Sequence, residues 1–299
     1  MSICIIILFS FLFSANEYDD SIYDIISSPR NNAVGGIHMA TNSINSIFDA
    51  PLDISYNDND LFISVNNFNK LLTTYHIAYC IYSNDNMNLS LGLVRREIYN
   101  NYNTQDAWID DGYPDLEELN YDMISLFSDK QTGLLLSYNK ILNKNFILGV
   151  NFKTELHKIG YISAFGYAMD IRTLLNLDKV SICFGIDDLF AVKEWETDFI
   201  ENNNINGYIS IAMHALENFT LFYEYGTHRD FIFGTEMKLV ERLSLRWGFS
   251  NMKDMTLSFG VGFDLKNINL EYTYKDNMDY ILGNNHILGF TLKLHHFSE

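Results

Sequence analysis

Apolar and polar residues alternate strictly over four stretches between Leu243 and Leu294, and this alternation constrains the fold more than any other feature of the chain. Side chains of a strand point to opposite faces in turn. Each stretch therefore predicts a strand with one apolar, aromatic face and one face of small, polar or charged residues. The predicted strands are 243–250, 257–264, 268–275 and 288–294.

The same pattern recurs about ten times earlier in the chain. A soluble sandwich would direct the apolar face to a core and the polar face to water. A barrel in lipid reverses this order, and its closure leaves no unpaired strand edge in the hydrocarbon. The number of strands favours an all-β, transmembrane, antiparallel up-and-down β-barrel of about 14 strands. The earlier strands are predicted at 61–65, 75–81, 89–93, 133–139, 146–155, 162–171, 180–187, 205–214, 218–225 and 231–239.

Composition agrees with this class. The chain of 299 residues has 19 Tyr and 22 Phe but only 3 Pro, which suits long strands with aromatic girdles. A mean hydropathy of −0.05 excludes a helical membrane protein but not a barrel, whose strands are only half apolar. The net charge of −18 argues against a nucleic-acid partner, because phosphate binding requires a basic surface.

The first residues predict export. The apolar run from Ile3 to Phe13 is too short to span a bilayer as a helix but suits a signal peptide. We therefore predict three parts: a signal peptide at 1–15, an N-terminal segment at 16–58 and the barrel at 59–299. Export is what a bacterial outer-membrane location requires.

The N-terminal segment carries a motif. Arg30 is followed by Gly35, Gly36 and Ala40, and then by Asp49-Ala50-Pro51. The arrangement resembles the FadL-like outer-membrane proteins, the long-chain fatty-acid transporter superfamily, and most closely its PorV/PorQ branch. That branch has Arg, Gly-Gly and a small residue at this spacing, followed by Asn-Pro-Ala, which Asp49 to Pro51 replaces loosely here. The resemblance implies that this segment is a plug in the lumen of a barrel of fourteen strands.

The chain end also fits the resemblance. Gly289 to Leu294 matches the Gly-x-x-apolar-x-apolar end that the barrel-assembly machinery recognises in outer-membrane proteins. The placement of Trp195, after a strand and before a polar loop, also resembles the pattern of the PorV/PorQ branch. For Trp195 and Trp247 we favour the simpler interpretation of aromatic anchors at the membrane interface.

Two acidic stretches, Glu97–Lys130 and Asp188–Asn204, lack sustained alternation and are predicted as loops. Their carboxylates do not have the spacing of an EF-hand, so we expect solvated acidic loops, no metal and no cofactor. Cys80 and Cys183 lie on the small or polar faces of distant strands. Buried free thiols are expected there, with a disulfide as the alternative.

Charges of both signs fall on the predicted inward face. One interpretation is a set of ion pairs and hydrogen bonds that hold the plug, and the other is a substrate path; we favour the first. The residues are Lys153, Asp170, Glu224, Glu236, Lys238, Arg246, Asp264, Glu271 and Lys275.

No nucleophile elbow, phosphate-binding loop, paired-cysteine zinc spacing or His-Glu-x-x-His motif occurs, so we expect no enzyme. The resemblance implies passive transport of hydrophobic small molecules across the outer membrane. Its alternatives are a PorV-like protein-interaction role in type IX secretion and a structural barrel without cargo. The expected partners are outer-membrane lipid, a hydrophobic ligand, the assembly machinery and, in the second case, secreted proteins.

Overall fold

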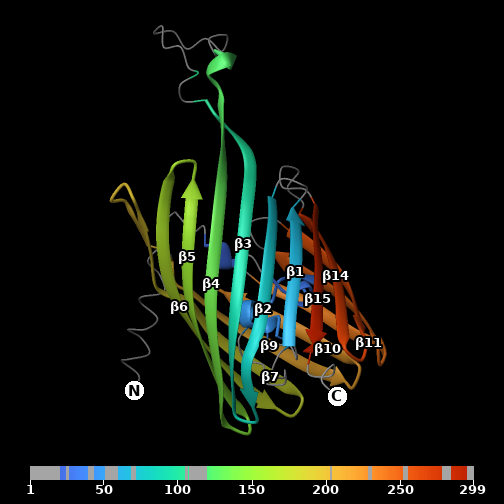
Figure 1. Ribbon diagram of the computed structural model, residues 1–299. Coiled ribbons are helices and arrows are strands. Elements are labelled where there is room, and N and C mark those ends of the chain that lie inside the picture. Colours follow the sequence, from blue (N-terminus) through green and yellow to red (C-terminus); the bar gives the residue numbers. More distant parts are fainter. Residues whose placement is uncertain are drawn as a thin grey trace.

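Alternating strands close into a barrel in the computed structural model of the chain (Figure 1). The structure describes residues 21–24, 27–39, 44–50, 60–68, 72–104, 107, 120–202, 204–227, 231–251, 255–277 and 284–294. The proposed signal peptide, Ala40 and Pro51 lie outside these ranges. No helix in the described part of the chain is long and apolar enough to cross a membrane.

The described residues form fifteen strands and four short helices. The strands are β1 (Asp60–Phe68), β2 (Leu72–Asn84), β3 (Met87–Asn103), β4 (Ser125–Asn143), β5 (Phe146–Ile159), β6 (Ile162–Leu177), β7 (Val180–Trp195), β8 (Ile200–Asn202), β9 (Asn206–Leu216), β10 (Phe219–Gly226), β11 (Ile232–Val240), β12 (Leu243–Asn251), β13 (Met255–Asp264), β14 (Ile268–Asn277) and β15 (Asn284–Lys293). The helices are η1 (Ile22–Asp24), α2 (Pro29–Ala33), α3 (Ser46–Asp49) and η3 (Tyr121–Met123).

Fourteen of these strands form the closed wall, which confirms the predicted architecture. Neighbours in sequence pair antiparallel, β7 continues to β9, and β1 pairs with β15 to close the ring. The extra strand, β8, pairs with β7 through Val192 to Glu194. Short turns at 85–86, 144–145, 178–179, 217–218, 241–242 and 265–267 all lie at one end of the barrel, because they connect alternate hairpins.

The two faces of the wall differ as the alternation predicts. Outward side chains are apolar and exposed, whereas inward side chains are mainly polar or small and buried. On β12 and β13, for example, Leu245, Trp247 and Phe259 point outward while Arg246 and Ser258 point inward. An apolar outer band with a polar interior is the arrangement that lipid requires.

The wall is taller over β3 and β4 than elsewhere, and Figure 1 shows this hairpin projecting beyond its neighbours. The prediction that Glu97–Lys130 is entirely loop is therefore wrong, because 97–103 and 125–130 are strand. A β-bulge between Ile98 and Asn101, with Asn100 at φ 60°, interrupts the pairing. A bulge shifts the side-chain alternation, so period-two analysis ends there.

The prediction that 188–204 is a loop is also wrong in part, and β-bulges again explain why. Strand β7 continues to Trp195, but its pairing with β6 shifts twice, between Tyr167 and Met169 and between Met169 and Ile171. Asp188 and Phe190 on β7 have φ of 60° and 55°. Each irregularity reverses which residues face inward, which hides the strand from a search for alternation.

Candidate functional site

Residues 27–39 and 44–50, here called the N-terminal segment, contact inward-facing side chains on many strands of the barrel. Glycines of the wall allow a close approach. A Cβ atom at Gly234 would lie 2.3 Å from the Val34 carbonyl oxygen, and one at Gly248 would lie 2.0 Å from the Gly35 nitrogen. Gly35 and Gly36 themselves have φ of 99° and 91°, a conformation that favours glycine.

Polar side chains of the wall also bind the backbone of the N-terminal segment. Hydroxyl and amide groups on separate strands donate to carbonyl oxygens of this segment. The bonds are Ser64 Oγ to Ser27 O (3.2 Å), Thr273 Oγ1 to Pro29 O (2.5 Å), Ser258 Oγ to Ala33 O (3.1 Å) and Asn151 Nδ2 to Ile47 O (2.9 Å). The inward polar face therefore binds the backbone of the N-terminal segment as well as its charged side chains.

Asp49 connects the two halves of the N-terminal segment. Its carboxylate accepts hydrogen bonds from the backbone N–H of Ser27 at 2.9 Å and of Ser28 at 3.0 Å, and from the Asn31 amide at 3.3 Å. Burial raises the pKa of this carboxyl, and the two backbone donors offset part of that rise. Asp49, the last residue of α3, therefore orders the start of α2.

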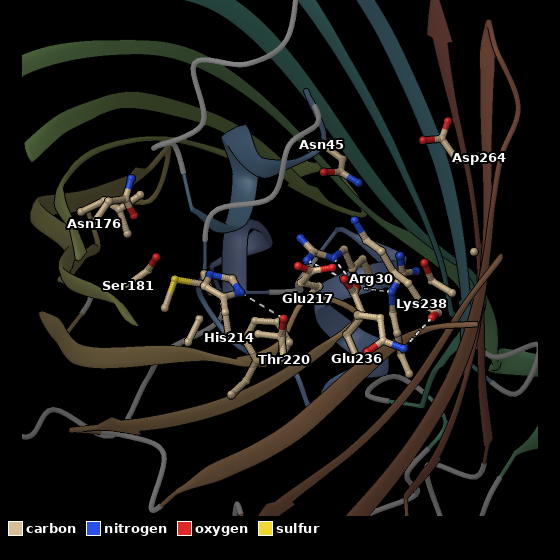
Figure 2. A pocket seen from close by; sticks show the side chains of 18 of the residues that line it. Arg30, Asn45, Asn176, Ser181, His214, Glu217, Thr220, Glu236, Lys238 and Asp264 are labelled. Carbon is tan, nitrogen blue, oxygen red and sulfur yellow. Dashed lines mark hydrogen bonds and ion pairs between the residues drawn. The ribbon is translucent and has the colours of Figure 1, made fainter. Parts of the chain in front are cut away.

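A chain of alternating charges joins the N-terminal segment to the wall (Figure 2). Arg30 Nε lies 2.6 Å from Glu236 Oε2, and Arg246 Nε lies 2.7 Å from the same oxygen. Arg246 Nη1 lies 2.9 Å from Glu271 Oε1, and the Asn45 amide donates to Glu271 Oε2 at 3.2 Å. Both ends of this chain, Arg30 and Asn45, belong to the N-terminal segment.

A second contact of this kind centres on His38. Its backbone N–H donates to Glu224 Oε2 at 2.6 Å, and its Nδ1 lies 2.9 Å from Glu224 Oε1. The imidazole also stacks on Tyr208, with ring centroids 4.5 Å apart. Glu224 is fully buried, so these contacts compensate its removal from water.

Asp170 lies in a separate buried network on β5, β6 and β7. Lys153 Nζ lies 2.7 Å from Asp170 Oδ1 and 3.0 Å from Asp188 Oδ1. Arg172 Nε donates to Asp187 Oδ1 at 2.8 Å. These pairs agree with the interpretation that inward charges form ion pairs, although here the partners are other wall residues.

A cavity of about 920 Å³ opens at the barrel end that carries the short turns. Its polar side includes Arg30, Asn45, Glu236, Lys238 and Asp264, several of which Figure 2 labels. Lys238 and Asp264 are exposed at this opening. The lining also includes the apolar residues Met39, Ile147, Leu174, Ala212 and Phe222, which lie among polar residues such as Ser181, His214 and Thr220. The cavity is therefore amphipathic.

Two buried apolar clusters lie where the N-terminal segment meets the wall. The first joins Ile22, Ile44, Ile47 and Phe48 to Phe62, Ala78, Cys80, Val94 and Leu135 of β1 to β4. The second joins Val34, Ile37 and Met39 to Leu174, Cys183, Tyr208, Ala212, Phe222 and Ile232. Cys80 and Cys183 are buried free thiols, which confirms the first expectation for them.

Some of the predicted site residues lie together at the contact between the N-terminal segment and the wall, and others do not. Arg30, Gly35, Gly36 and Asp49 all take part in the contacts of the N-terminal segment described above. Lys275 is half-buried on β14, and Trp247 lies in the middle of β12 on the outer face, beside Phe233.

Trp195 is placed differently from the expected interfacial anchor. It shares the inward side of β7 with buried Ala191 and Lys193, and its ring lies 5.0 Å from that of buried His157. Trp195 keeps the phase of the inward residues Cys183 and Gly185, because the two irregularities in between cancel; the expectation differed because β7 was predicted to end at Asp187.

Sequence reasoning did not identify His38, Asn45, Phe48 or Asn151. Nothing in their local sequence distinguishes them, because their partners lie far away along the chain. Within the described ranges, no three His, Cys, Asp or Glu side chains are arranged to hold a metal ion. The site residues described above interact through ion pairs, hydrogen bonds and apolar contacts.

Solved structures with a similar fold include two toluene transporters and a FadL homologue. The toluene transporter TodX of Pseudomonas putida gives a TM-score of 0.66 at 9% identity, covering 92% of this chain and 100% of that one. The toluene transporter TbuX of Ralstonia pickettii gives 0.61 at 9% identity, covering 90% and 99%. A Pseudomonas aeruginosa FadL homologue gives 0.55 at 11% identity, covering 90% and 98%.

The chain therefore has a FadL-like fold, and at these identities the likeness concerns the fold alone. No family model matches the chain, and no curated protein matches its sequence.

Proposed function

We propose that this protein is a bacterial outer-membrane channel for the passive uptake of hydrophobic small molecules, and that its N-terminal segment is a plug. The observation that carries the proposal is the amphipathic cavity beside that segment, within a barrel whose fold is shared with toluene transporters. The apolar outer band fits lipid, and barrels of this kind carry their short turns on the periplasmic side. The cavity then faces the periplasm.

A polar wall lined with ion pairs does not by itself attract an apolar solute. Partly exposed apolar residues of the lining do, because a ligand that lies against Ile141 and Ile147 removes hydrocarbon surface from water. Four charges of the lining, Arg30, Glu236, Arg246 and Glu271, pair with one another and hold the plug in this proposal. Passive transport needs no energy-coupling residues, which agrees with a site made of packing and hydrogen bonds.

Uptake of an apolar fluorophore by intact cells tests this proposal. We expect cells that produce the protein to take up N-phenylnaphthylamine faster than cells with an unrelated porin at equal abundance. The polar solute glucose should enter the cells that produce this protein no faster than the cells with the porin. The fluorophore brightens on leaving water, so the rate is read directly.

Unchanged fluorophore uptake would contradict the transport proposal. A PorV-like secretion role makes the opposite prediction for the native host. Deleting the gene would then remove proteins from the cell surface while uptake of the fluorophore stays the same.

A further inference from the structure

We propose that the outer face of β3, β4 and β5 carries a binding site for the phosphate groups of an anionic lipid in the outer leaflet, and that Lys130 and Lys158 bind the phosphate. The inference rests on the outer-membrane location in the proposed function and is independent of the molecule that is transported. It concerns the lipid-facing surface of the wall rather than the lumen.

Lys130 on β4 and Lys158 on β5 lie directly opposite each other. Both point outward, because the alternate positions Gln131 and His157 are buried in the lumen. Side chains in such a pair have Cβ atoms about 4.5–5.5 Å apart, and like charges directly opposite each other destabilise a sheet. Two facing lysines are therefore best accommodated when an anion lies between them.

The described part of the chain does not supply that anion. Glu97 lies opposite Lys130 on β3, but Arg95 holds its carboxylate, with Arg95 Nε donating to Glu97 Oε1 at 2.7 Å. Lys130 Nζ instead lies over the ring of Tyr99, 5.6 Å from the centroid. Among the described residues, no carboxylate forms an ion pair with Lys158.

The other end of this row is also occupied. Ser163 on β6 lies opposite Lys158, and its hydroxyl and backbone N–H donate to the Glu196 carboxylate at 2.9 and 3.2 Å. The carboxylates at the two ends of the row, Glu97 and Glu196, are thus both bonded to neighbours. The positive charge remains concentrated at the centre of the row.

The row lies at one edge of the apolar outer band. On β4, the outward residues between Lys130 and Lys140 are Thr132, Leu134, Leu136 and Tyr138. The separation of the two lysines corresponds to about 33 Å along the strand, at about 3.3 Å per residue. A strand tilt of about 40° reduces this to a height of about 25 Å, which is the height of the apolar band of such barrels. Lys130 and Lys140 therefore mark its two edges.

The edge at Lys130 is the one opposite the short turns, and in the proposed orientation it lies in the outer leaflet. Lysine and arginine at this level attract anionic lipid. Arg95, one row nearer the membrane centre and with 47% of its side chain exposed, adds a third cation. Within the described ranges, outward lysine and arginine residues at this end occur only on β3, β4 and β5.

Native mass spectrometry of the purified protein in detergent, titrated with bisphosphorylated lipid A, tests the site. The double variant with Lys130→Gln and Lys158→Gln should bind lipid A about 30-fold more weakly than the unaltered protein, at about five-fold for each lysine. Lipid A without phosphate groups should bind both proteins equally weakly.

Lys140→Gln is the matched control, because it removes a lysine from the same face of the same strand at the opposite edge of the apolar band. It should bind lipid A as tightly as the unaltered protein does. Heat-dependent migration on a gel confirms that each variant is a folded barrel.

Stability provides a second measurement that a merely structural role of the lysines would not change. Lys158→Gln removes the like-charge pair and leaves the contact of Lys130 with Tyr99. In vesicles of phosphatidylcholine alone, which carry no net charge, this variant should resist denaturant better than the unaltered protein. In vesicles that contain lipid A the order should reverse, because the unaltered protein is stabilised by the bound phosphate.

Equal binding of lipid A by the double variant and the unaltered protein, or an equal loss in Lys140→Gln, overturns the proposed site. The same order of stability in both kinds of vesicle overturns it as well. These outcomes are distinct from failure of the proposed function. If cells take up the fluorophore but the double variant binds lipid A normally, transport stands and only this site is wrong. If uptake fails while the lysines are required for lipid A, the site stands and the transport role is wrong.

Discussion

Gly248→Ala is expected to push the N-terminal segment away from the wall and to raise single-channel conductance in planar bilayers. The added Cβ would lie 2.0 Å from the Gly35 nitrogen and 2.2 Å from the Val34 carbonyl carbon. Both are backbone atoms, so no side-chain rotation relieves the clash. The expected loss of stability is about 1–3 kcal/mol, as for other overpacked cores, and it falls on the contacts of the N-terminal segment.

Gly166→Ala is the matched control for this experiment. Its nearest atom would be the Val192 carbonyl oxygen at 3.3 Å, and no residue of the N-terminal segment is among its closest neighbours. We expect its conductance to equal that of the unaltered protein. Deleting residues 18–54 should reproduce or exceed the Gly248→Ala effect. If conductance stays low in both, the N-terminal segment does not block the lumen.

Phe259→Lys is expected to impair insertion into lipid. Phe259 lies near the middle of β13 on the outer face, and 49% of its surface is exposed. A lysine on the lipid face costs about 2–4 kcal/mol when it is near the bilayer midplane. The measurement is the denaturant concentration at which the barrel unfolds from lipid vesicles.

The control for Phe259→Lys must face inward where there is room. Ser258, the neighbour in sequence, is unsuitable because it is buried and donates to Ala33 O. Ser244 lines the open cavity and offers the needed space. Ser244→Lys should unfold at nearly the denaturant concentration of the unaltered protein. If Ser244→Lys and Phe259→Lys lower that concentration equally, the assignment of inward and outward faces is wrong.

The strands could be predicted from sequence because one rule, alternation with period two, acts locally. It located all fourteen strands of the wall and assigned the inward side of residues such as Glu236 and Arg246. It failed where bulges at Asn100, Asp188 and Phe190 change the phase, so parts of β3, β4 and β7 were assigned to loops. Trp195 was expected beyond the end of a strand because β7 was predicted to end at Asp187, whereas β7 continues to Trp195.

The candidate site was predictable only as a set of residues. Arg30 and Glu236 lie 206 positions apart, and His38 and Glu224 lie 186 positions apart. No local pattern indicates such pairs, because barrel closure and the path of the N-terminal segment decide them. Phe48 and Gly92 likewise form a matched pair only after that segment meets β3. The resemblance predicted a plug but not the side chains that hold it.

The N-terminal segment and the wall are matched at many points rather than at one. Glycines admit its backbone, hydroxyl groups bind its carbonyls, and Glu236 and Glu224 bind Arg30 and His38. Single ion pairs exposed to water contribute little, but buried partners are costly to separate. We therefore expect these contacts to break in steps. Those of α3 should break first, because a single helical turn has little stability of its own.

The central claim is that the apolar face of the wall meets lipid while the polar face encloses the lumen. Spin labels at Leu245 and Phe290 outside and at Ser244 and Lys238 inside test it in vesicles. The outer labels should relax with oxygen and be shielded from a water-soluble nickel chelate, and the inner labels should show the reverse. Equal access of the nickel chelate to all four positions would contradict the account.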